Sequence, residues 1–299
     1  MTIIPPPIAP ERAYSILTSW YCTYARDLPW RHKGTTPWGI LVCEVMSQQT
    51  PVARIAPQWE EWMRRWPRPQ DMATALPAQV LIAWDRLGYP RRALRLLECA
   101  QEITDRFGGH VPAQRADLLS LPGIGPYTAD ALLAFAFKHY SVVLDTNIRR
   151  VLARWHGCAL PAPHQTKAEL ARATSYVPCD PAQAAAWNGA LMEFGALICT
   201  ASRPRCDQCP VRHECAWRHL GYPDDPYAAK RTTQKFSGTQ REARGKIMAA
   251  LRQPGVSSSQ TDLLAHSKLS SERFYPALAA LVAEGLVAVD SQERYSLPA

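Results

Sequence analysis

Apolar residues recur at helical spacing along most of this 299-residue chain. From residue 11 to about residue 220 they fall three and four positions apart, which is the period of a helix with one buried face. The alternation typical of a half-buried strand is almost absent there. The main part of the chain is therefore predicted to be all-α. The pattern predicts helices over residues 38–49, 52–66, 77–88, 91–108, 115–121, 127–140, 146–155 and 184–199.

The helical period stops at residues 221–238, GYPDDPYAAKRTTQKFSG, and restarts beyond them. Three further helices are predicted at 241–253, 259–267 and 271–285, followed by a hairpin around Asp290 and Ser291. This order is typical of a winged helix, a variant of the helix-turn-helix. We expect a main domain over 1–222, a linker over 223–239 and a winged-helix-like domain over 240–299. The small domain is either a DNA-binding module or a packing or partner module, and the pattern leaves both open.

Charge and composition narrow the class of protein. The net charge is +8 and most basic residues are arginines, whose planar fork suits phosphates, so a polyanion is the expected partner. No apolar run reaches the length of about eighteen residues that a membrane-spanning helix needs. The first residues, MTIIPPPIAPERAY, lack the pattern of a secretory signal. A cytoplasmic protein without a membrane partner is expected.

The nine cysteines divide into two groups. Five are scattered in mostly apolar surroundings and are interpreted as small core residues: Cys22, Cys43, Cys99, Cys158 and Cys179. The other four have the spacing C-x6-C-x2-C-x5-C within residues 199–215, which in a cytosolic protein indicates a metal site. Four thiolates in one short loop suit a zinc ion or a cubane [4Fe–4S] cluster, and the spacing alone does not decide between them.

The segment LLSLPGIGPYTADALLAFA, residues 118–136, predicts a helix, a tight turn and a second helix. Gly123 and Gly125 allow the turn and bring backbone N–H groups close to a ligand. The second helix begins at this turn, and its N-terminus favours a negative charge. The turn is therefore a candidate phosphate site, although a plain helical hairpin would show the same residues.

Two carboxylates have positions that suit the cleavage of a glycoside. Asp145, in VVLDTNIRRVLARW, is the predicted N-cap of a helix, and hydrogen bonds from that helix are expected to keep it ionised. Glu44 shares a helix face with Ile40 and Leu41, so burial is expected to raise its pKa and suit it to general acid catalysis. A structural cap and a buried glutamate paired with arginine are the alternatives. Together the two residues form a possible acid and charge-stabilising pair.

These features together resemble the helix-hairpin-helix DNA glycosylase superfamily. LPGIGPYT followed by Asp145 carries the resemblance, and the cysteine spacing is that of its iron–sulfur members. Five further motifs look like the MutY-type adenine DNA glycosylases: LPWR (28–31), CEVMSQQT (43–50), RLGYPRRA (86–93), LDTNIRRV (144–151) and NGALMEFGALICT (188–200). The resemblance covers about residues 15–222.

The resemblance implies a fold of two helical subdomains with double-stranded DNA bound in the cleft between them. It implies a monofunctional, monomeric enzyme of base excision repair that hydrolyses the N-glycosidic bond of adenine mispaired with 8-oxoguanine or guanine. The adenine is flipped out of the duplex before cleavage.

The resemblance also implies a role for individual residues. Glu44 corresponds to the acid that protonates adenine and Asp145 to the carboxylate that stabilises the sugar cation, with Tyr127 and Asn147 in support. Residues that correspond to contacts with the base pocket, the opposing strand or the phosphates are Arg26, Trp30, Arg31, Gln49, Thr50, Leu87, Tyr89, Gly123 and Gly125. The ligands of a [4Fe–4S] cluster correspond to Cys199, Cys206, Cys209 and Cys215.

The chain departs from the family pattern at three places. Ser47 stands where leucine is usual, and Gly189 stands where many members carry a glutamine or glutamate that faces the adenine. The C-terminal segment is about half the length of the Nudix-like domain that helps most bacterial members recognise 8-oxoguanine. These departures leave open how the enzyme would contact the edge of the adenine and which opposing base it would prefer.

Three other functions are compatible with parts of the pattern. A lyase of the endonuclease III type needs an amine after the hairpin glycines, but Tyr127 occupies that place and no lysine occurs between Lys33 and Lys138. A thymine–guanine mismatch glycosylase also has the tyrosine and the aspartate. A non-enzymatic iron–sulfur regulator that binds DNA would leave Glu44 and Asp145 without a role.

Overall fold

The computed structural model describes residues 7–231, 236–253 and 255–299. Their secondary structure is predominantly helical, as predicted, and their contacts divide them into two compact units. The first unit comprises residues 7–31, 113–115 and 125–231, and the second comprises 32–112, 116–124 and 236–299 without residue 254. No helix in the described ranges combines the length and the apolar character that crossing a membrane requires.

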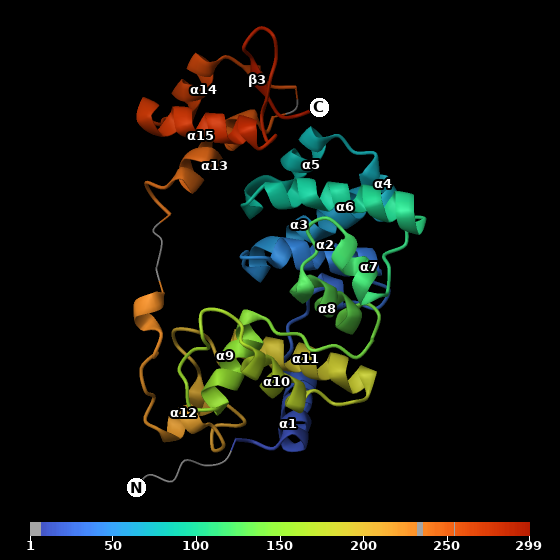
Figure 1. Ribbon diagram of the computed structural model, residues 1–299, viewed down its shortest axis with the longest axis vertical. Helices are drawn as coiled ribbons and strands as arrows, with labels where there is room; N and C mark the ends of the chain where they lie inside the picture. The colour runs from blue at the N-terminus through green and yellow to red at the C-terminus, as the bar shows by residue number, and fades with distance from the viewer. Residues whose placement is uncertain (1–6, 232–235, 254) are drawn as a thin grey trace. The chain divides into compact units, whose positions relative to one another are not determined.

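The first unit contains the N-terminal helix and the helices from α8 to α12 (Figure 1). Its elements are α1 (Pro10–Tyr24), η1 (Pro29–Arg31), α8 (Pro126–Phe135), α9 (Thr146–Trp155), α10 (Lys167–Tyr176), α11 (Pro181–Leu197), η3 (Cys206–Gln208), α12 (Ala216–His219) and η4 (Ala228–Lys230).

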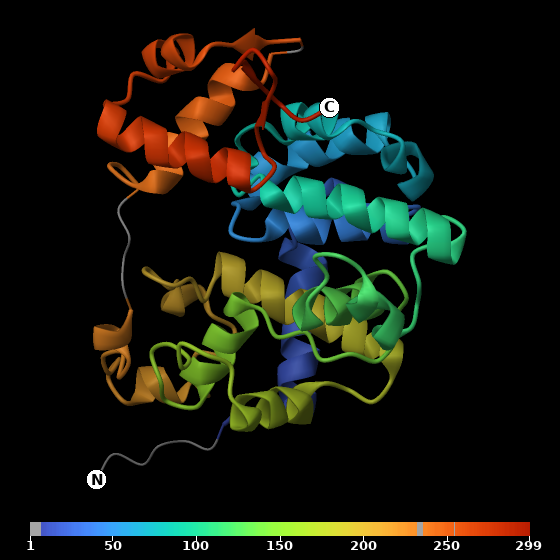
Figure 2. The same ribbon diagram turned by 45° about the horizontal axis from the view of Figure 1, so that its top comes forward.

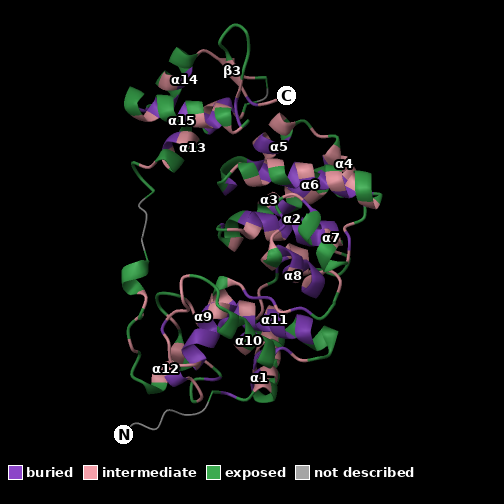
Figure 3. Ribbon diagram, viewed as in Figure 1, coloured by how far each residue is buried: buried purple, intermediate pink, exposed green. Residues whose placement is uncertain are grey.

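Helix α11 runs through the core of the first unit. It is apolar around most of its circumference, which is typical of a helix enclosed by others, and it packs against α1, α8 and α9. Trp187 and Phe194 of α11 are buried with Trp155 of α9 and Leu17 of α1. Figure 3 shows buried residues over much of α11, while the residues at its start, 181–183, are exposed. This core fixes the loops that precede and follow α9 and α11.

The second unit contains the helices from α2 to α7 and the C-terminal segment. Its N-terminal elements are α2 (Pro37–Ser47), α3 (Val52–Arg65), α4 (Pro69–Ala73), α5 (Pro77–Trp84), η2 (Asp85–Leu87), α6 (Arg91–Phe107) and α7 (Arg115–Ser120).

Tryptophans build the core of this part of the second unit. Trp38, Trp62 and Trp84 are buried, and Trp62 meets Trp84 and Trp66 edge to face at centroid distances of 5.5 and 5.0 Å. The indole N–H of Trp38 donates to the carbonyl of Trp66 at 3.0 Å, which satisfies the polar atom of a buried ring. These contacts join α2, α3 and α5 around the start of η2.

The C-terminal segment, residues 240–299, is called the C-terminal module below. It consists of α13 (Gln240–Leu251), β1 (Ser257–Ser258), α14 (Gln260–Ser267), α15 (Ser271–Ala283), β2 (Ala288–Val289) and β3 (Tyr295–Ser296). Figure 2 shows α13 and α15 packed across each other. The three short strands form an antiparallel sheet in the order β1-β3-β2. The three helices and the hairpin were predicted; β1 was not, because two serines carry no hydrophobic pattern.

Two expectations need correction or fall outside the description. Cys22 and Cys179 are exposed, so they are not the core residues that the sequence analysis assumed, whereas Cys43 and Cys99 are buried. The predicted linker over 223–239 includes residues 232–235, which lie outside the described residues. The domain boundaries at 222 and 239 remain predictions.

Candidate active site

Glu44 lies on α2, in the second unit. The Thr36 hydroxyl accepts a hydrogen bond from the backbone N–H of Gly39 at 3.2 Å, and Pro37 occupies the first helical position, so α2 begins where the sequence predicts. Glu44 is partly exposed, while Leu41 and Val45 on the same helix are buried. The helix therefore presents the Glu44 carboxylate at the border of an apolar face, and its predicted role as the acid stays a prediction.

Asp145 lies in the first unit and caps α9. One carboxylate oxygen accepts from the backbone N–H of Ile148 at 2.6 Å, and the other accepts from the side-chain amide of Asn147 at 2.7 Å. The segment before Asp145 is held by the buried Asn188, which donates to Ser141 O at 2.9 Å and accepts from Val143 N–H at 3.3 Å. The carboxylate is thus fixed by the helix that follows it and by α11.

The ionisation of Asp145 departs from the sequence expectation. Burial raises its pKa above the ordinary value of 3.8, although the hydrogen bonds from Ile148 and Asn147 and the charge of Arg150 act in the opposite direction. The expectation of an ionised cap considered the hydrogen bonds alone. Desolvation is the larger effect here. Keeping Asp145 ionised therefore costs free energy, and a positive charge nearby would offset that cost.

Arg150 connects Asp145 to the cysteine loop. Its guanidinium donates to the side-chain oxygen of Asn147 at 2.8 Å, to Gly195 O at 2.7 Å and to Cys199 O at 2.8 Å. The side chain is buried, and desolvation lowers its pKa. The backbone of α11 comes close enough for these bonds because Gly195 has no side chain; a Cβ there would lie 2.7 Å from the Cβ of Asn147.

The glycines of the hairpin have different conformations. Gly123 has φ +78°, a value that side chains rarely adopt, and a Cβ there would lie 3.1 Å from Arg95. Gly125 is extended at φ −93° and caps α8, with open space where a Cβ would be. Only Gly123 therefore needs left-handed backbone, whereas Gly125 leaves the N-terminus of α8 uncovered. Tyr127 lies in the first turn of α8 and is partly buried.

Arg26 and Arg31 converge on Glu193, a residue that the sequence analysis did not single out. Arg26 makes a two-pronged ion pair with Glu193, with both N···O distances at 2.7 Å, and Arg31 adds a third contact at 2.9 Å. The Glu193 side chain is 1% exposed, and the two arginines hold its pKa down at about 2 against the effect of burial. The Arg31 guanidinium also lies 5.4 Å from the centre of the Tyr21 ring. Trp30, between the arginines, is partly buried.

The residues that the resemblance assigns to the opposing strand lie on two loops of the second unit. Gln49 and Tyr89 are exposed, and both have positive φ, +58° and +47°. Thr50 and Leu87 are buried, and the Thr50 hydroxyl donates to Leu87 O at 3.0 Å. The structure therefore brings these four residues together, with Gln49 and Tyr89 facing outward.

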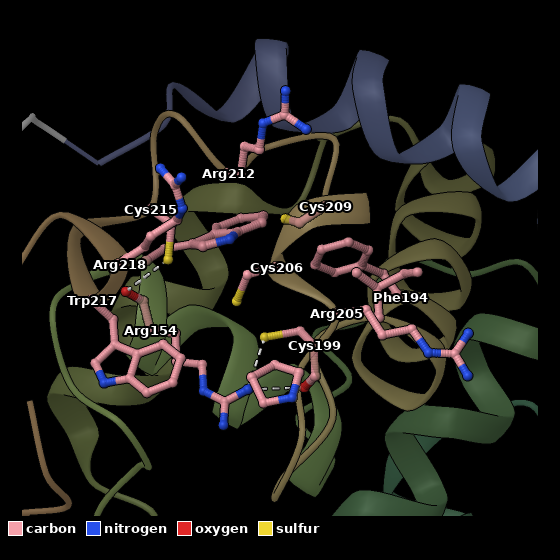
Figure 4. Close-up of a pocket in the computed structure, with 13 residues that line it drawn as sticks. Arg154, Phe194, Cys199, Arg205, Cys206, Cys209, Arg212, Cys215, Trp217 and Arg218 are labelled. Atoms are coloured by element: carbon pink, nitrogen blue, oxygen red, sulfur yellow. Dashed lines mark hydrogen bonds between the residues drawn. The ribbon is translucent and has the colours of Figure 1, made fainter. Parts of the chain in front are cut away.

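The four cysteines of the loop line one pocket (Figure 4). Cys199 follows the end of α11, Cys206 begins η3, Cys209 follows η3 and Cys215 caps α12. Arg154 donates to the sulfur of Cys199 at 3.2 Å and to the carbonyls of Cys199, Thr200 and Ala201.

The chemistry of this pocket fits an iron–sulfur cluster. Burial raises the pKa of the Cys199 and Cys215 thiols and raises that of Cys209 to about 12, so ionised sulfurs there need bound positive charge. In the described ranges no three Cys, His, Asp or Glu side chains converge closely enough for a single metal ion. Sulfurs spread around a pocket suit a cubane, in which each cysteine binds a different corner.

Comparison with known proteins places the chain among DNA repair enzymes. Residues 42–175 match the HhH-GPD superfamily base excision DNA repair protein family, and residues 199–215 match the iron–sulfur binding domain of endonuclease III. The adenine DNA glycosylase of Mycolicibacterium smegmatis is 44% identical over 283 residues, which is 94% of each chain.

The chain belongs to the adenine DNA glycosylase family. As a member of that family it is a base excision repair enzyme that hydrolyses N-glycosyl bonds in DNA, and its cysteine loop holds a [4Fe–4S] cluster. The reading as a non-enzymatic regulator is therefore set aside, and the choice between zinc and iron–sulfur is settled by the match of the loop.

Adenine DNA glycosylases share their fold with enzymes that carry other names. The thymine-DNA glycosylase of Aeropyrum pernix is 35% identical over 67% of this chain and 92% of its own length. The solved structure of a thermostable thymine-DNA glycosylase superposes with a TM-score of 0.64 and 27% identity, covering 71% of this chain and 97% of that one. These relatives bear out the helix-hairpin-helix fold.

Four residues that hold the loops of the site have no local sequence signal comparable to that of Asp145: Arg150, Arg154, Glu193 and Arg92, which donates to the Thr50 hydroxyl at 3.2 Å. Glu193 alone could have been found by the reasoning applied to Glu44, because it is an isolated acid inside an apolar helix. The three arginines donate to backbone carbonyls of distant segments, which the sequence pattern does not reveal.

Proposed function

We propose that this enzyme removes adenine mispaired with 8-oxoguanine or guanine in double-stranded DNA, acting as a monofunctional, monomeric glycosylase in the cytoplasm. The observation that carries the proposal is the 44% identity with an adenine DNA glycosylase across 94% of both chains. The net charge of +8 supports a duplex partner, because each neutralised phosphate releases counterions.

Glu44 supplies the proton in this proposal. Adenine is a poor leaving group as an anion, so protonation of the base is needed before the glycosidic bond breaks at a useful rate. The position of Glu44 on α2, partly exposed beside the buried Leu41 and Val45, supports this role because its carboxyl stays accessible to a base. General acid catalysis of this kind contributes about 10²–10⁴-fold to a rate.

Asp145 stabilises the positive charge that develops on the sugar. Its carboxylate is held by Ile148 N–H and the Asn147 amide, so it does not need to reorganise as the charge appears. The cationic sugar favours the ionised form, against the burial that raises the pKa of Asp145. Asn147 is thus a positioning residue for Asp145.

The reaction stops at base removal. Strand cleavage by a lyase needs an amine that forms a Schiff base with the sugar, and Tyr127 stands after the hairpin glycines in place of a lysine. The uncovered N-terminus of α8 at Gly125 supports a contact with a DNA phosphate. Arg26, Trp30 and Arg31 belong to the base pocket, and Gln49, Thr50, Leu87 and Tyr89 to the contact with the opposing strand.

Base release from a panel of duplexes tests the proposal. We expect single-turnover release of adenine opposite 8-oxoguanine and guanine, and strand cleavage only after heat or alkali. Release of thymine from thymine–guanine pairs, with adenine left intact, would instead assign the activity named in the relative from Aeropyrum pernix.

A further inference from the structure

The segment Asp85–Arg91, which joins α5 to α6, contains an unusual concentration of strained backbone. Asp85 has φ +43° and Tyr89 has φ +47°, and both carry side chains in a region that such residues rarely adopt. Gly88 between them has φ +82°. Backbone of this kind persists only where surrounding contacts determine it.

The inner side of the segment is held by Arg92. Its guanidinium donates to Leu87 O at 3.1 Å and Gly88 O at 2.9 Å, and also to Val45 O at the end of α2 at 2.9 Å. Desolvation lowers the pKa of Arg92 to about 10. Trp84 adds a bond from its indole N–H to Gly88 O at 2.8 Å. These bonds fix the carbonyls of the segment, and the Arg92 guanidinium also lies 5.6 Å from the centre of the Tyr89 ring, but among the described residues the Tyr89 hydroxyl accepts no bond from this side.

The outer side is held by the C-terminal module. The Arg241 guanidinium donates to the Tyr89 hydroxyl at 2.5 Å and lies 5.4 Å from the centre of its ring. Arg252, at the end of α13, lies 3.8 Å from the carboxylate of Asp85. Glu284, at the end of α15, lies 4.0 Å from Arg91. The module therefore reaches the segment at its first residue, its last residue and Tyr89.

The module is poorly suited to bind a phosphate backbone by its own charge. Residues 240–299 contain seven Lys and Arg against six Asp and Glu, although the whole chain has a net charge of +8. The outward face of α15 contains no basic residue; it consists of Ser271, Glu272, Tyr275, Pro276, Ala279 and Ala283. The C-terminal ends of α13 and α15 lie at the segment Asp85–Arg91.

We propose that the C-terminal module is a brace for the segment Asp85–Arg91, and that Arg241 is the positioning residue through which it holds Tyr89. Tyr89 is exposed on a strained loop, so in the absence of Arg241 its side chain would sample other orientations. The consequence for recognition of the mispair rests on the proposed function, in which Tyr89 contacts the opposing strand. The brace then restricts the enzyme to mispairs that accept Tyr89 in its fixed orientation.

Hydrogen exchange of the full-length protein without DNA tests the brace directly. Arg241→Gln removes the guanidinium, and Arg294→Gln, at the hairpin where Arg294 bonds to Ser257, is the matched control. We expect amide exchange of peptides covering 85–91 to rise roughly three- to tenfold in Arg241→Gln, the factor that a hydrogen bond of ordinary strength supplies. The control should exchange at the wild-type rate. Equal exchange in all three proteins would overturn the brace.

Arg241→Gln could also loosen the module itself, and a second variant separates the two effects. Tyr89→Phe deletes only the hydroxyl that accepts from Arg241 and leaves α13 unchanged. We expect it to raise exchange at 85–91, and we expect Arg241→Gln to add little in the double variant, since both remove the same bond. Fully additive effects would show that the two residues act independently and would contradict the proposal.

Binding and excision distinguish the brace from a phosphate contact. We expect Arg241→Gln to keep the wild-type dependence of duplex affinity on salt. We also expect the ratio of the rate of adenine release opposite 8-oxoguanine to the rate opposite cytosine to fall in this variant. A salt slope reduced by about one, with exchange at 85–91 unchanged, would assign Arg241 to a phosphate instead. If wild type releases no base from any duplex, the proposed function fails, but the exchange measurement still decides the brace.

Discussion

Arg150 donates a hydrogen bond of 2.8 Å to the side-chain oxygen of Asn147, whose amide nitrogen donates in turn to Asp145 at 2.7 Å. The same guanidinium binds Cys199 O, so one buried side chain orients the support of the candidate catalytic carboxylate and anchors the first cysteine of the loop. A change at Arg150 is therefore expected to affect both places.

We predict that Arg150→Gln lowers single-turnover adenine release by about tenfold or more and shortens the lifetime of the cluster in air. The first effect follows because Asn147 loses the donor that fixes its amide, and Asp145 then reorganises during the reaction. Quench-flow kinetics and the decay of visible absorbance measure the two effects. Arg106→Gln, an exposed change on α6, is the control. Wild-type rates in Arg150→Gln would show that Asn147 is held adequately without it.

We predict that Glu44→Gln and Asp145→Asn each reduce adenine release by at least about 10² while duplex binding is retained, because each removes a charge or proton needed only in the transition state. Single-turnover assays and fluorescence anisotropy measure the two quantities. Excision at the wild-type rate by Glu44→Gln opposite 8-oxoguanine or guanine would remove Glu44 from the role of the acid.

The acid limb of the pH profile should report Asp145. Its pKa lies above the ordinary 3.8, and the ionised form is the active one, so the rate of adenine release should fall as pH decreases through that raised value. A protonated Asp145 is favoured in the folded protein, so its contribution to stability is present at low pH and is lost as pH rises. Single-turnover rates of adenine release between pH 4 and 8 test the expected fall in rate. A rate that is flat down to pH 4 would contradict it.

The pKa of Glu193 is shifted in the opposite direction from that of Asp145, so its effect on stability depends on pH in the opposite way. Its pKa is lowered from 4.5 to about 2 by the bonds from Arg26 and Arg31, so its stabilising contribution is present above pH 4.5 and is lost as pH falls toward 2. We predict that Glu193→Gln lowers the free energy of unfolding by about 3 kcal/mol near pH 7, because it leaves two partly buried guanidinium groups without their carboxylate. Urea titrations at pH 7 and 3.5 measure the difference. It should shrink at the lower pH.

The cysteine loop makes a prediction about metal content. Protein purified without oxygen should be yellow-brown and contain iron and acid-labile sulfide in equal amounts, because four buried thiols surround a pocket that suits a cubane. Elemental analysis with visible spectroscopy measures this. Stoichiometric zinc in colourless, freshly prepared protein would contradict it.

The sequence predicts features whose cause is local. Thr36 and Pro37 define the start of α2, and Asp145 defines the start of α9, because a cap and its helix are neighbours in the chain. The C-terminal helices were found from their apolar period for the same reason. The cysteine loop was recognised from a spacing that lies within seventeen residues, 199–215.

Features that depend on distant segments were missed. Glu193 meets Arg26 across 167 positions, and Arg92 binds carbonyls more than forty positions away. Such contacts depend on how helices pack, which a hydrophobic period does not specify. The direction of the Asp145 pKa was also missed, because burial of a single carboxyl depends on every segment around it.

The cysteine loop is attached to the folded protein by contacts that contain no metal. Arg154 holds the carbonyls of Cys199, Thr200 and Ala201, and its guanidinium lies 4.5 Å from the centre of the Trp217 ring. The loop therefore takes its shape from α9, which lies outside the cysteine spacing. A change at Arg154 is therefore expected to disturb the cluster site although none of the four cysteines is altered.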